Sequence, residues 1–173
     1  VNYLSYKKDL IKVMERDEGE ENKLTQVELA DKLGVSVSTV AMWETGKRTP
    51  NFKTLNEVVV RDENLSTTYL KVTINDSVLE NFVGDGLMIS TPTGSTAYSL
   101  SAGGPIVDPK LSCFCVTPIC PHSLGARPLV FSDAAKLQVK NICTREKVLH
   151  LTVDGRATFD IFYGDVVQVT RSE

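Results

Sequence analysis

The sequence has little of several features that would mark a special class of protein. Aromatic residues make up 7% of its 173 residues, and no apolar run approaches the roughly 20 residues that span a bilayer. The start, VNYLSYKKDL, lacks the apolar core and small-residue cleavage site of a signal peptide. The remaining composition, 42% hydrophobic and 24% charged, excludes collagen-like, mucin-like and grossly disordered chains. We therefore expect a cytoplasmic protein with no membrane segment.

The four cysteines form no zinc or disulfide pattern. Cys113 and Cys115 are spaced C-x-C, Cys120 follows, and Cys143 stands alone. No C-x-x-C pair and no histidine at zinc-finger spacing accompany them. We expect buried reduced thiols and no metal held by the protein.

Charge and pattern divide the chain into two parts. With 19 basic and 22 acidic residues the net charge is −3, so affinity for nucleic acid requires a local patch. Residues 5 to 60 have a helical pattern, whereas residues 66 to 173 alternate as short strands broken by turn residues. This predicts an α+β protein with a small all-α domain over residues 1–54 and a β-rich, sandwich-like domain over residues 55–173.

The N-terminal part has the signals of two helices and a turn. Thr25 is a candidate N-cap, Gly34 suits the turn, and Ser36 can cap a second helix that ends at Gly46. A third helix is expected from near Asn51 through Leu55. Over residues 24–55 the run LTQVELADKLGVSVSTVAMWETGKRTPNFKTL resembles the helix-turn-helix of the lambda repressor/Cro-like family, within a module spanning residues 5–55.

The helix-turn-helix resemblance implies binding to double-stranded DNA through a recognition helix in the major groove. The implied DNA contacts are Gln26, Ser36, Ser38, Thr39, Lys47 and Arg48. Val37 and Ala41 stand where the family usually has Arg, Gln or Asn, and residues 1–54 carry nine basic and nine acidic side chains. Few phosphate contacts are therefore expected, and a fold used only for packing or dimerisation is the alternative.

The second part begins with hairpin signals. Asn75-Asp76-Ser77 lies between TTYLKVTI and VLENFV, and Asp154-Gly155 lies between KVLHLTV and ATFDIF. KLQVKNI and DVVQVT have the alternation of further strands. Residues 84–107 predict a strand, a polar turn and a helix that begins near Ser95 or Thr96. Such a helix start would direct backbone N–H groups toward a ligand.

From Leu55 onward the chain is similar to the C-terminal domain of NAD kinases. The similarity lies in LNEVV at residues 55–59, GDGL at 84–87, STPTGSTAYSLSAGGP at 90–105, TPICPHS at 117–123, RPLV at 127–130 and VDG at 153–155. The resemblance implies a domain that binds NAD, in an enzyme that phosphorylates the adenosine ribose 2′-hydroxyl with ATP and a divalent metal such as Mg²⁺. The NAD-binding residues that it implies are Asn56, Glu57, Asp85, Thr93, Thr96, Ala97, Tyr98 and Ser101.

In the resemblance, Asn56 and Glu57 would hold ribose hydroxyls or the nicotinamide end, and Asp85 would reach the nicotinamide side, often across a subunit contact. The remaining residues would line the adenine and ribose pocket. Each position has an alternative. Asn56 and Glu57 could end the third helix, Asp85 could serve only as a turn residue, and Tyr98 could belong to the core.

The family's Gly-Gly-Asp-Gly motif, whose aspartate is the expected base, has no counterpart before Asn56, so no catalytic residue is assigned. We therefore expect an NAD kinase-family protein that is weak or inactive alone. The alternative is a transcriptional regulator in which the β domain senses NAD, NADP or a related adenine nucleotide. A gene-fusion or fragment product is a third possibility. We expect a homo-oligomer, a dimer or tetramer.

Overall fold

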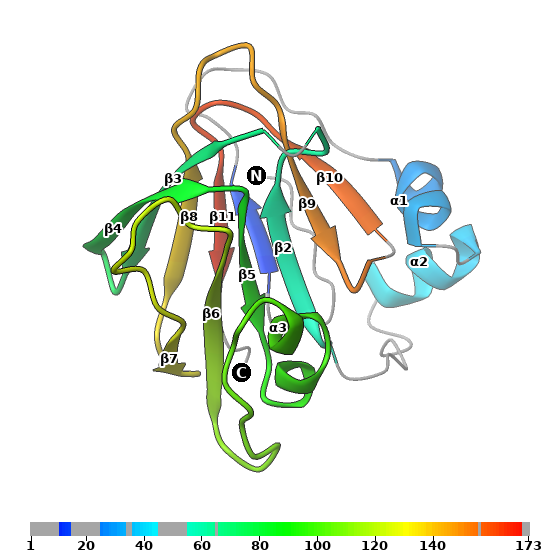
Figure 1. Cartoon of the computed structure of the whole chain (residues 1–173). Coiled ribbons are helices and arrows are strands. Elements are labelled where there is room, and N and C mark those ends of the chain that lie inside the picture. The colour runs from blue at the N-terminus through cyan, green and yellow to red at the C-terminus, as the bar shows by residue number, and fades with distance from the viewer. Residues whose placement is uncertain are drawn as a thin grey trace.

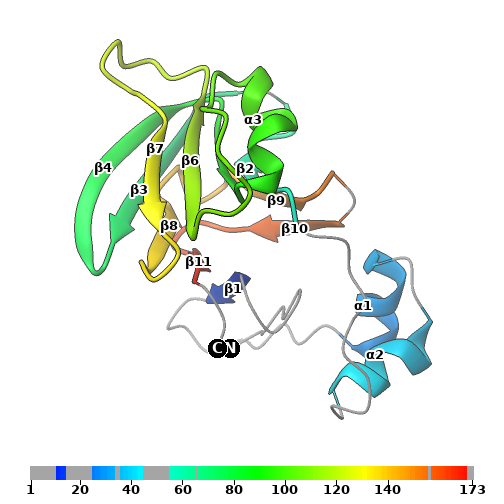
Figure 2. The ribbon, with the colours of Figure 1, turned by 90° about the horizontal axis from the view of Figure 1, so that it is seen from below.

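The computed structural model describes residues 11–14, 25–33, 36–44, 55–64, 66–155 and 157–170. The main feature of these residues is a pair of antiparallel β-sheets that face each other, with short helical segments outside them (Figures 1 and 2). A β-rich, sandwich-like second region is therefore confirmed.

One sheet has five strands, which are antiparallel throughout. In spatial order they are β1 (Ile11–Met14), β11 (Val166–Val169), β8 (Leu137–Asn141), β3 (Thr68–Ile74) and β4 (Ser77–Gly84). β3 and β4 form a hairpin, and β8 joins β3 to β11. The sheet thus combines strands from both ends of the chain.

The other sheet has six strands and carries the segments that concern function. In spatial order they are β10 (Ala157–Ile161), β9 (Leu149–Val153), β2 (Glu57–Arg61), β5 (Gly86–Ser90), β6 (Cys113–Ile119) and β7 (Leu129–Ser132). β2 lies between β9 and β5, so residues near its start meet segments that are far away in sequence.

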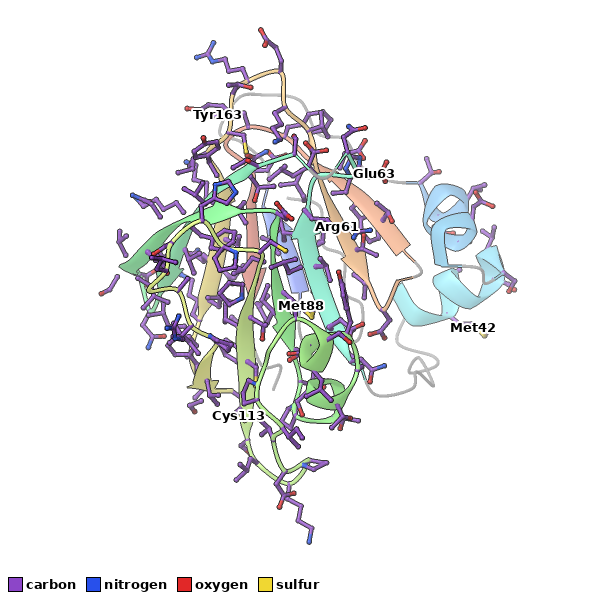
Figure 3. The ribbon with its side chains drawn as sticks, viewed as in Figure 1. Met42, Arg61, Glu63, Met88, Cys113 and Tyr163 are labelled. Carbon is purple, nitrogen blue, oxygen red and sulfur yellow. The ribbon has the colours of Figure 1, made fainter. Side chains whose placement is uncertain are left out.

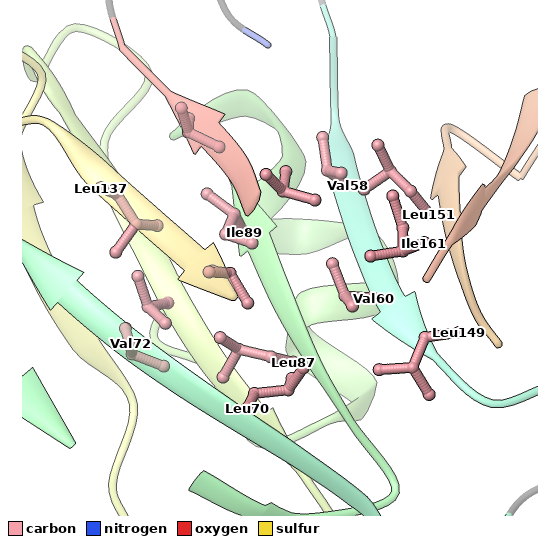
Figure 4. Packing of buried hydrophobic residues seen from close by; sticks show 14 of the residues in the cluster. Val58, Val60, Leu70, Val72, Leu87, Ile89, Leu137, Leu149, Leu151 and Ile161 are labelled. Atoms are coloured by element: carbon pink, nitrogen blue, oxygen red, sulfur yellow. The ribbon is translucent and has the colours of Figure 1, made fainter. Parts of the chain in front are cut away.

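The core fills the space between the two sheets. Buried apolar residues from both sheets form one cluster in which side chains of the two sheets meet (Figure 4). The cluster includes Val58, Val60, Leu70, Val72, Leu87, Ile89, Leu137, Leu149, Leu151 and Ile161, all at most 3% exposed. On the opposite face of β2 and β5, Val59 and Met88 are also buried, so both faces of these two strands are covered.

Both predicted hairpins are confirmed, and their turns have the backbone that tight hairpins need. Asn75 and Asp76 have φ values of 48° and 62°, and Asp154 and Gly155 have values of 47° and 65°. Two successive residues with positive φ match the right-handed twist of the flanking strands. Asn, Asp and Gly are the residues that adopt this conformation most readily.

A buried ion pair joins the loop after β2 to the loop before β9. Lys147 Nζ lies 3.1 Å from Asp62 Oδ2, and both side chains are largely buried. Burial alone would raise the pKa of the Asp62 carboxyl. Hydrogen bonds from Ser66, the Asn64 backbone and Lys147, together with the Lys147 charge, outweigh burial and lower this pKa from 3.8 to about 2. The ionised pair therefore fixes two loops at the end of the sheet.

Helices occur in the N-terminal part where two were predicted. α1 (Gln26–Leu33) follows Thr25, and α2 (Val37–Glu44) follows Ser36, on the β10 side of the six-stranded sheet (Figures 1 and 2). Gly34, Gly46 and most of the expected third helix lie outside the described residues. The complete helix-turn-helix therefore stays a prediction. None of the described helices is both long and apolar enough to cross a membrane.

The prediction of a helical pattern over residues 5 to 60 is wrong in two places. Ile11–Met14 is a strand that pairs with Val166–Val169, which satisfies backbone groups at the edge of the five-stranded sheet. Glu57–Arg61 is also a strand, because its three consecutive valines favour extended structure and its backbone pairs on both sides. The alternative that Asn56 and Glu57 end a helix is therefore wrong as well.

Candidate functional site

The candidate site is built around Asn56 and Glu57, at the point where β2 begins. On one side, the Thr91 backbone N–H donates to Asn56 O at 2.9 Å, just after β5 ends. The Thr91 hydroxyl donates to Leu55 O at 2.7 Å and accepts the Gly94 N–H at 3.1 Å. One threonine thus joins the start of β2 to the turn that follows β5.

Gly94 brings this turn into direct contact with Asn56. A Cβ atom added at Gly94 would lie 1.9 Å from Asn56 O and 2.6 Å from Asn56 Cα. No side chain fits between the two backbones. The glycine is therefore required by a close approach, and the position of Asn56 is tied to that of the turn.

On the other side, Asp154 of the β9–β10 turn holds the same two residues. Its Oδ1 atom accepts the backbone N–H groups of Asn56 and Glu57 at 2.8 and 3.1 Å. In return, the Asp154 N–H donates to Glu57 O at 3.0 Å. The start of β2 is therefore held from both neighbouring strands.

The Glu57 carboxyl is half-buried in these surroundings. Its Oε2 atom is buried and has no hydrogen-bond partner among the described residues. Burial raises the pKa of the Glu57 carboxyl above its ordinary value, and the negative charge of Asp154 raises this pKa further. A buried oxygen without a partner is costly, so a ligand hydroxyl that donates to it would stabilise the site.

Beyond Thr91 the chain forms a short helical segment that carries most of the predicted site residues. η1 (Thr93–Thr96) is a 3₁₀ turn, and α3 (Tyr98–Ser101) is a single α-turn. The side chains of Thr93, Thr96, Ala97, Tyr98 and Ser101 are exposed. Tyr98 is 41% exposed, so the alternative that it belongs to the core is wrong.

Two buried serines attach this segment to the rest of the domain. Ser95 Oγ donates to Pro92 O at 2.7 Å and accepts the Val107 N–H at 3.1 Å. Ser99 Oγ lies 3.1 Å from Thr117 Oγ1 of β6. Because buried residues alternate with exposed ones, η1 and α3 present a fixed surface of hydroxyls and one aromatic ring.

The backbone amides of this segment do not serve as predicted. The Gly94 N–H donates to Thr91 Oγ1, the Ser95 N–H to Pro92 O, and the Ala97 N–H to Gly94 O. These three amides are used inside the turn, so the expectation that the helix start directs its amides toward a ligand is wrong for Gly94, Ser95 and Ala97.

Asp85 lies apart from the other predicted residues. Asp85 forms the bend between β4 and β5. The next residue, Gly86, pairs with Arg61 of β2, whereas Ser90 pairs with Glu57. Arg61 and Glu57 are four residues apart along β2, which corresponds to about 13 Å. Figure 3 shows Arg61 and Glu63 at one end of this sheet, Met88 midway and Cys113 toward the other end. Asp85 therefore does not join Glu57 within one chain.

Asp85 has a thiol as its neighbour. A hydrogen bond to the Asp85 carboxylate, together with the charge of that carboxylate, raises the pKa of the exposed Cys120 thiol. All four cysteines are free, but Cys120 is exposed and Cys113 partly so. The expectation of buried thiols is therefore confirmed for Cys115 and Cys143 and wrong for Cys120.

The predicted DNA-contacting residues are only partly described. Gln26 is the first residue of α1, and Ser36 and Ser38 stand at the start of α2 with their hydroxyl oxygens 2.9 Å apart. All three are exposed, and Thr39 lies on α2. Lys47 and Arg48 lie outside the described residues. The described part thus places four of the six on or next to α1 and α2.

No metal centre can be built from the described side chains. Nowhere among them do three or more His, Cys, Asp or Glu residues gather closely enough to hold an ion. Glu57 and Asp154 alone therefore do not form a centre in which protein side chains enclose a divalent metal. The chemistry that the site does offer is hydrogen bonding to hydroxyl groups and contact with an aromatic ring.

Three residues with structural roles at the site were not predicted to act there. Thr91, Gly94 and Asp154 belong to the segments that carry the family resemblance, but their contacts to Asn56 and Glu57 span 35 residues or more. Asp154 had one local signal, the Asp-Gly turn, and this signal indicates a hairpin rather than a ligand for a distant backbone.

The comparisons with known proteins agree on one family. Residues 55–173 match the sequence model of the ATP-NAD kinase C-terminal domain, and residues 18–59 match a helix-turn-helix model. NAD kinases of Syntrophotalea carbinolica and Trichlorobacter lovleyi are 41% and 44% identical over 76% and 69% of this chain. The chain spans 46% and 42% of the lengths of these two relatives.

Solved structures agree with the sequence matches. Yeast NADH kinase complexed with NADH has a TM-score of 0.64 and 35% identity, with 68% of this chain and 34% of that chain covered. An NAD kinase from Archaeoglobus fulgidus in complex with ATP has a TM-score of 0.62 and 26% identity, with 79% and 57% covered.

Proposed function

This chain belongs to the NAD kinase family over residues 55–173, and on that premise we propose that this region binds NAD as the nucleotide to be phosphorylated. The observation that carries the proposal is the junction between Asn56–Glu57 and η1. There the half-buried Glu57 carboxyl has an oxygen, Oε2, without a hydrogen-bond partner among the described residues, and the carboxyl would turn to accept ribose hydroxyls when the dinucleotide binds. The exposed ring of Tyr98 offers a face for a purine.

The proposed reaction is the ATP-dependent phosphorylation of NAD to NADP. The NADH bound by the yeast relative and the ATP bound by the archaeal relative support a dinucleotide acceptor and a nucleoside triphosphate donor. Phosphoryl transfer depends on positioning and on charge stabilisation. Mg²⁺, which the family implies, has no protein ligands among the described residues, so the triphosphate itself would have to carry it.

We propose that residues 55–173 bind the dinucleotide but turn it over slowly or not at all without further residues. No Gly-Gly-Asp-Gly motif precedes Asn56, so the residue that would accept the 2′-hydroxyl proton is missing from the sequence. The chain also corresponds to less than half of the two bacterial relatives. Binding by residues 55–173 and turnover should therefore depend on different residues.

A homo-oligomer, a dimer or tetramer, completes the proposal. The family resemblance implies that Asp85 reaches the nicotinamide side across a subunit contact, and its separation of about 13 Å along the sheet from Glu57 is compatible with such a role. Mixing Asp85→Ala with Glu57→Gln chains tests this assignment, because a mixed dimer would regain one intact site. If mixing restores no NAD binding above the average of the two variants, the shared site is wrong.

Calorimetry with NAD, NADP and ATP tests the main proposal. We expect saturable binding of NAD or NADP by the full chain. We also expect little NADP formation when NAD, ATP and Mg²⁺ are supplied together. Absence of dinucleotide binding would refute the proposal, and turnover at a rate usual for kinases, about 1 to 100 per second, would refute the expected weakness.

The second candidate function is a transcriptional regulator that responds to NAD(P). The helix-turn-helix match over residues 18–59 favours it, as do the helices α1 and α2. Regulation would require the nucleotide to bind the DNA-competent and incompetent states with different affinity. Selection of preferred DNA duplexes, followed by binding with and without NADP at two salt concentrations, tests it. Failure to enrich any sequence excludes this function.

A further inference from the structure

We propose that Asp154, in the turn between β9 and β10, is a positioning residue that sets Asn56 and Glu57 in the geometry that binds the dinucleotide. This inference rests on the NAD-binding function proposed above. Asp154 is assigned no direct contact with the ligand. It acts through the backbone of the two residues that it holds.

The hydrogen bonds place Asp154 where regular strand pairing stops. The β2–β9 ladder reaches the pair Val58 and Val153, so Asp154 is the next residue outward. There its carboxylate accepts the N–H groups of Asn56 and Glu57 at 2.8 and 3.1 Å. A carboxylate oxygen that accepts two amides makes stronger bonds than a neutral acceptor does. The Asp154 side chain therefore adds hydrogen bonds to the backbone of β2 beyond the last β2–β9 strand pair.

The opposite strand holds the same residue from the other direction. Asn56 O accepts the Thr91 N–H, while Asn56 N donates to Asp154. Both backbone polar groups of Asn56 are thus fixed, one from each neighbouring strand. Loss of Asp154 would free the amide side alone, because β9 and β10 keep their own five-pair ladder from Ala157–Val153 to Ile161–Leu149.

A comparison with the other hairpin shows that a turn aspartate need not act in this way. Asp76 also has positive φ, 62° against 47° for Asp154, although it is the second positive-φ residue of its turn and Asp154 is the first. Its carboxylate is exposed and pairs with Lys136 Nζ at 2.9 Å. The two turns share a backbone conformation, but only the carboxylate of Asp154 holds the proposed binding residues. Asp76 therefore supplies a matched control.

Asp154 also acts on Glu57 by its charge. Its negative charge adds to burial in raising the pKa of the Glu57 carboxyl. Ser90, which pairs with Glu57 from β5, and Thr91, which follows it, carry no charge. Asp154→Asn keeps an oxygen that can accept the two amides but removes the charge. This variant therefore separates the geometric action of Asp154 from the electrostatic one.

The experiment compares Asp154→Ala, Asp154→Asn and Asp76→Ala with the unmodified full chain, by calorimetric titration with NAD. We expect Asp154→Ala to weaken NAD binding about tenfold or more, because a displaced Glu57 loses about one charged hydrogen bond to the ribose. Asp76→Ala imposes the same strain at a positive φ and should bind NAD as the unmodified chain does. At neutral pH, the NAD affinity of Asp154→Asn should stay within about threefold of the affinity of the unmodified chain.

The dependence of NAD affinity on pH gives a readout that a merely structural role would not change. An ionised Glu57 accepts ribose hydroxyls, so affinity should fall as the pH drops through the pKa of Glu57. Without the Asp154 charge that pKa is lower, and in Asp154→Asn the fall should move to lower pH.

The outcomes separate the two proposals. If the unmodified chain binds no dinucleotide, the proposed function fails and this inference fails with it. If the unmodified chain binds NAD and Asp154→Ala binds it equally well, only the positioning role is refuted. Should Asp154→Ala not fold, Asp154→Gly, which tolerates the positive φ and also lacks the carboxylate, takes its place, and NAD binding equal to that of the unmodified chain refutes the positioning role.

Discussion

Replacement of Gly94 by alanine tests the contact on which the candidate site depends. The added Cβ would lie 1.9 Å from Asn56 O and 2.4 Å from Asn56 C, where ordinary contact begins at 3.4 Å. The two backbones must therefore separate by about 1.5 Å, because neither neighbour is a flexible side chain end. Overpacking of this kind costs about 1 to 3 kcal/mol, and contact with backbone places Gly94→Ala near the upper figure.

Two measurements separate the effects of Gly94→Ala. Urea unfolding should show a free energy of unfolding lower by about 3 kcal/mol. Calorimetry with NAD should show binding weakened about tenfold or more, because the strain displaces Asn56 and with it Glu57. The two losses share one cause, the separation of η1 from the start of β2.

Gly125→Ala is the control. A Cβ at Gly125 would meet only Ser123 Oγ, at 3.7 Å, which is ordinary contact. Its unfolding free energy should change by no more than about 0.5 kcal/mol, and NAD binding should not change. The reasoning is refuted if Gly94→Ala matches Gly125→Ala in both stability and NAD affinity, because the close approach would then have no consequence.

Three further predictions concern single side chains. The pKa of Asp62, lowered to about 2 from 3.8, means that its ionised form adds about 2 kcal/mol of stability. That contribution is complete above pH 3.8 and disappears as the pH falls through about 2. Unfolding curves of Asp62→Asn and the unmodified chain should therefore differ at pH 6 and converge near pH 2. Tyr98→Ala should weaken NAD binding about fivefold with little change in stability, measured by calorimetry and urea unfolding, because the ring is exposed. Thr91→Val removes the hydroxyl that bonds Leu55 O and the Gly94 N–H, and should lower the unfolding free energy by about 1 to 3 kcal/mol.

The features predicted correctly from the sequence are those that short segments determine. The turns at Asn75-Asp76 and Asp154-Gly155 follow from residues that tolerate positive φ, and the strands beside them follow from alternation. Tight turns and alternation depend on neighbours within a few residues. Such features are visible without knowledge of the rest of the fold.

The errors arise where distant partners decide the structure. Ile11–Met14 is a strand because Val166–Val169 offers it an edge, more than 150 residues later in the chain. Glu57–Arg61 had a local signal in its three valines, but its position after a helical module favoured a helical interpretation. Propensity is a weak guide when tertiary pairing is available.

The candidate site also contains some residues that the sequence could predict and others that it could not. Tyr98 and Ser101 could be named from the resemblance, and their exposure agrees with a binding surface. The direction of the Asp154 carboxylate could not be named, because its backbone partners lie 97 and 98 residues earlier in the chain. Sequence reasoning found the residues that would touch a ligand more readily than those that hold them in place.

The fixed backbone at the start of β2 supports the proposal that dinucleotide binding and turnover depend on different groups. Asn56 is held by Thr91, Gly94 and Asp154, which all belong to the β-rich region, so its geometry needs no further domain. Fixing the geometry before the ligand arrives lowers the entropy lost on binding. Phosphoryl transfer requires, in addition, charged groups around the transferred phosphate. On the proposed function, the contacts at the start of β2 would therefore serve dinucleotide binding, and turnover would depend on charged groups beyond them.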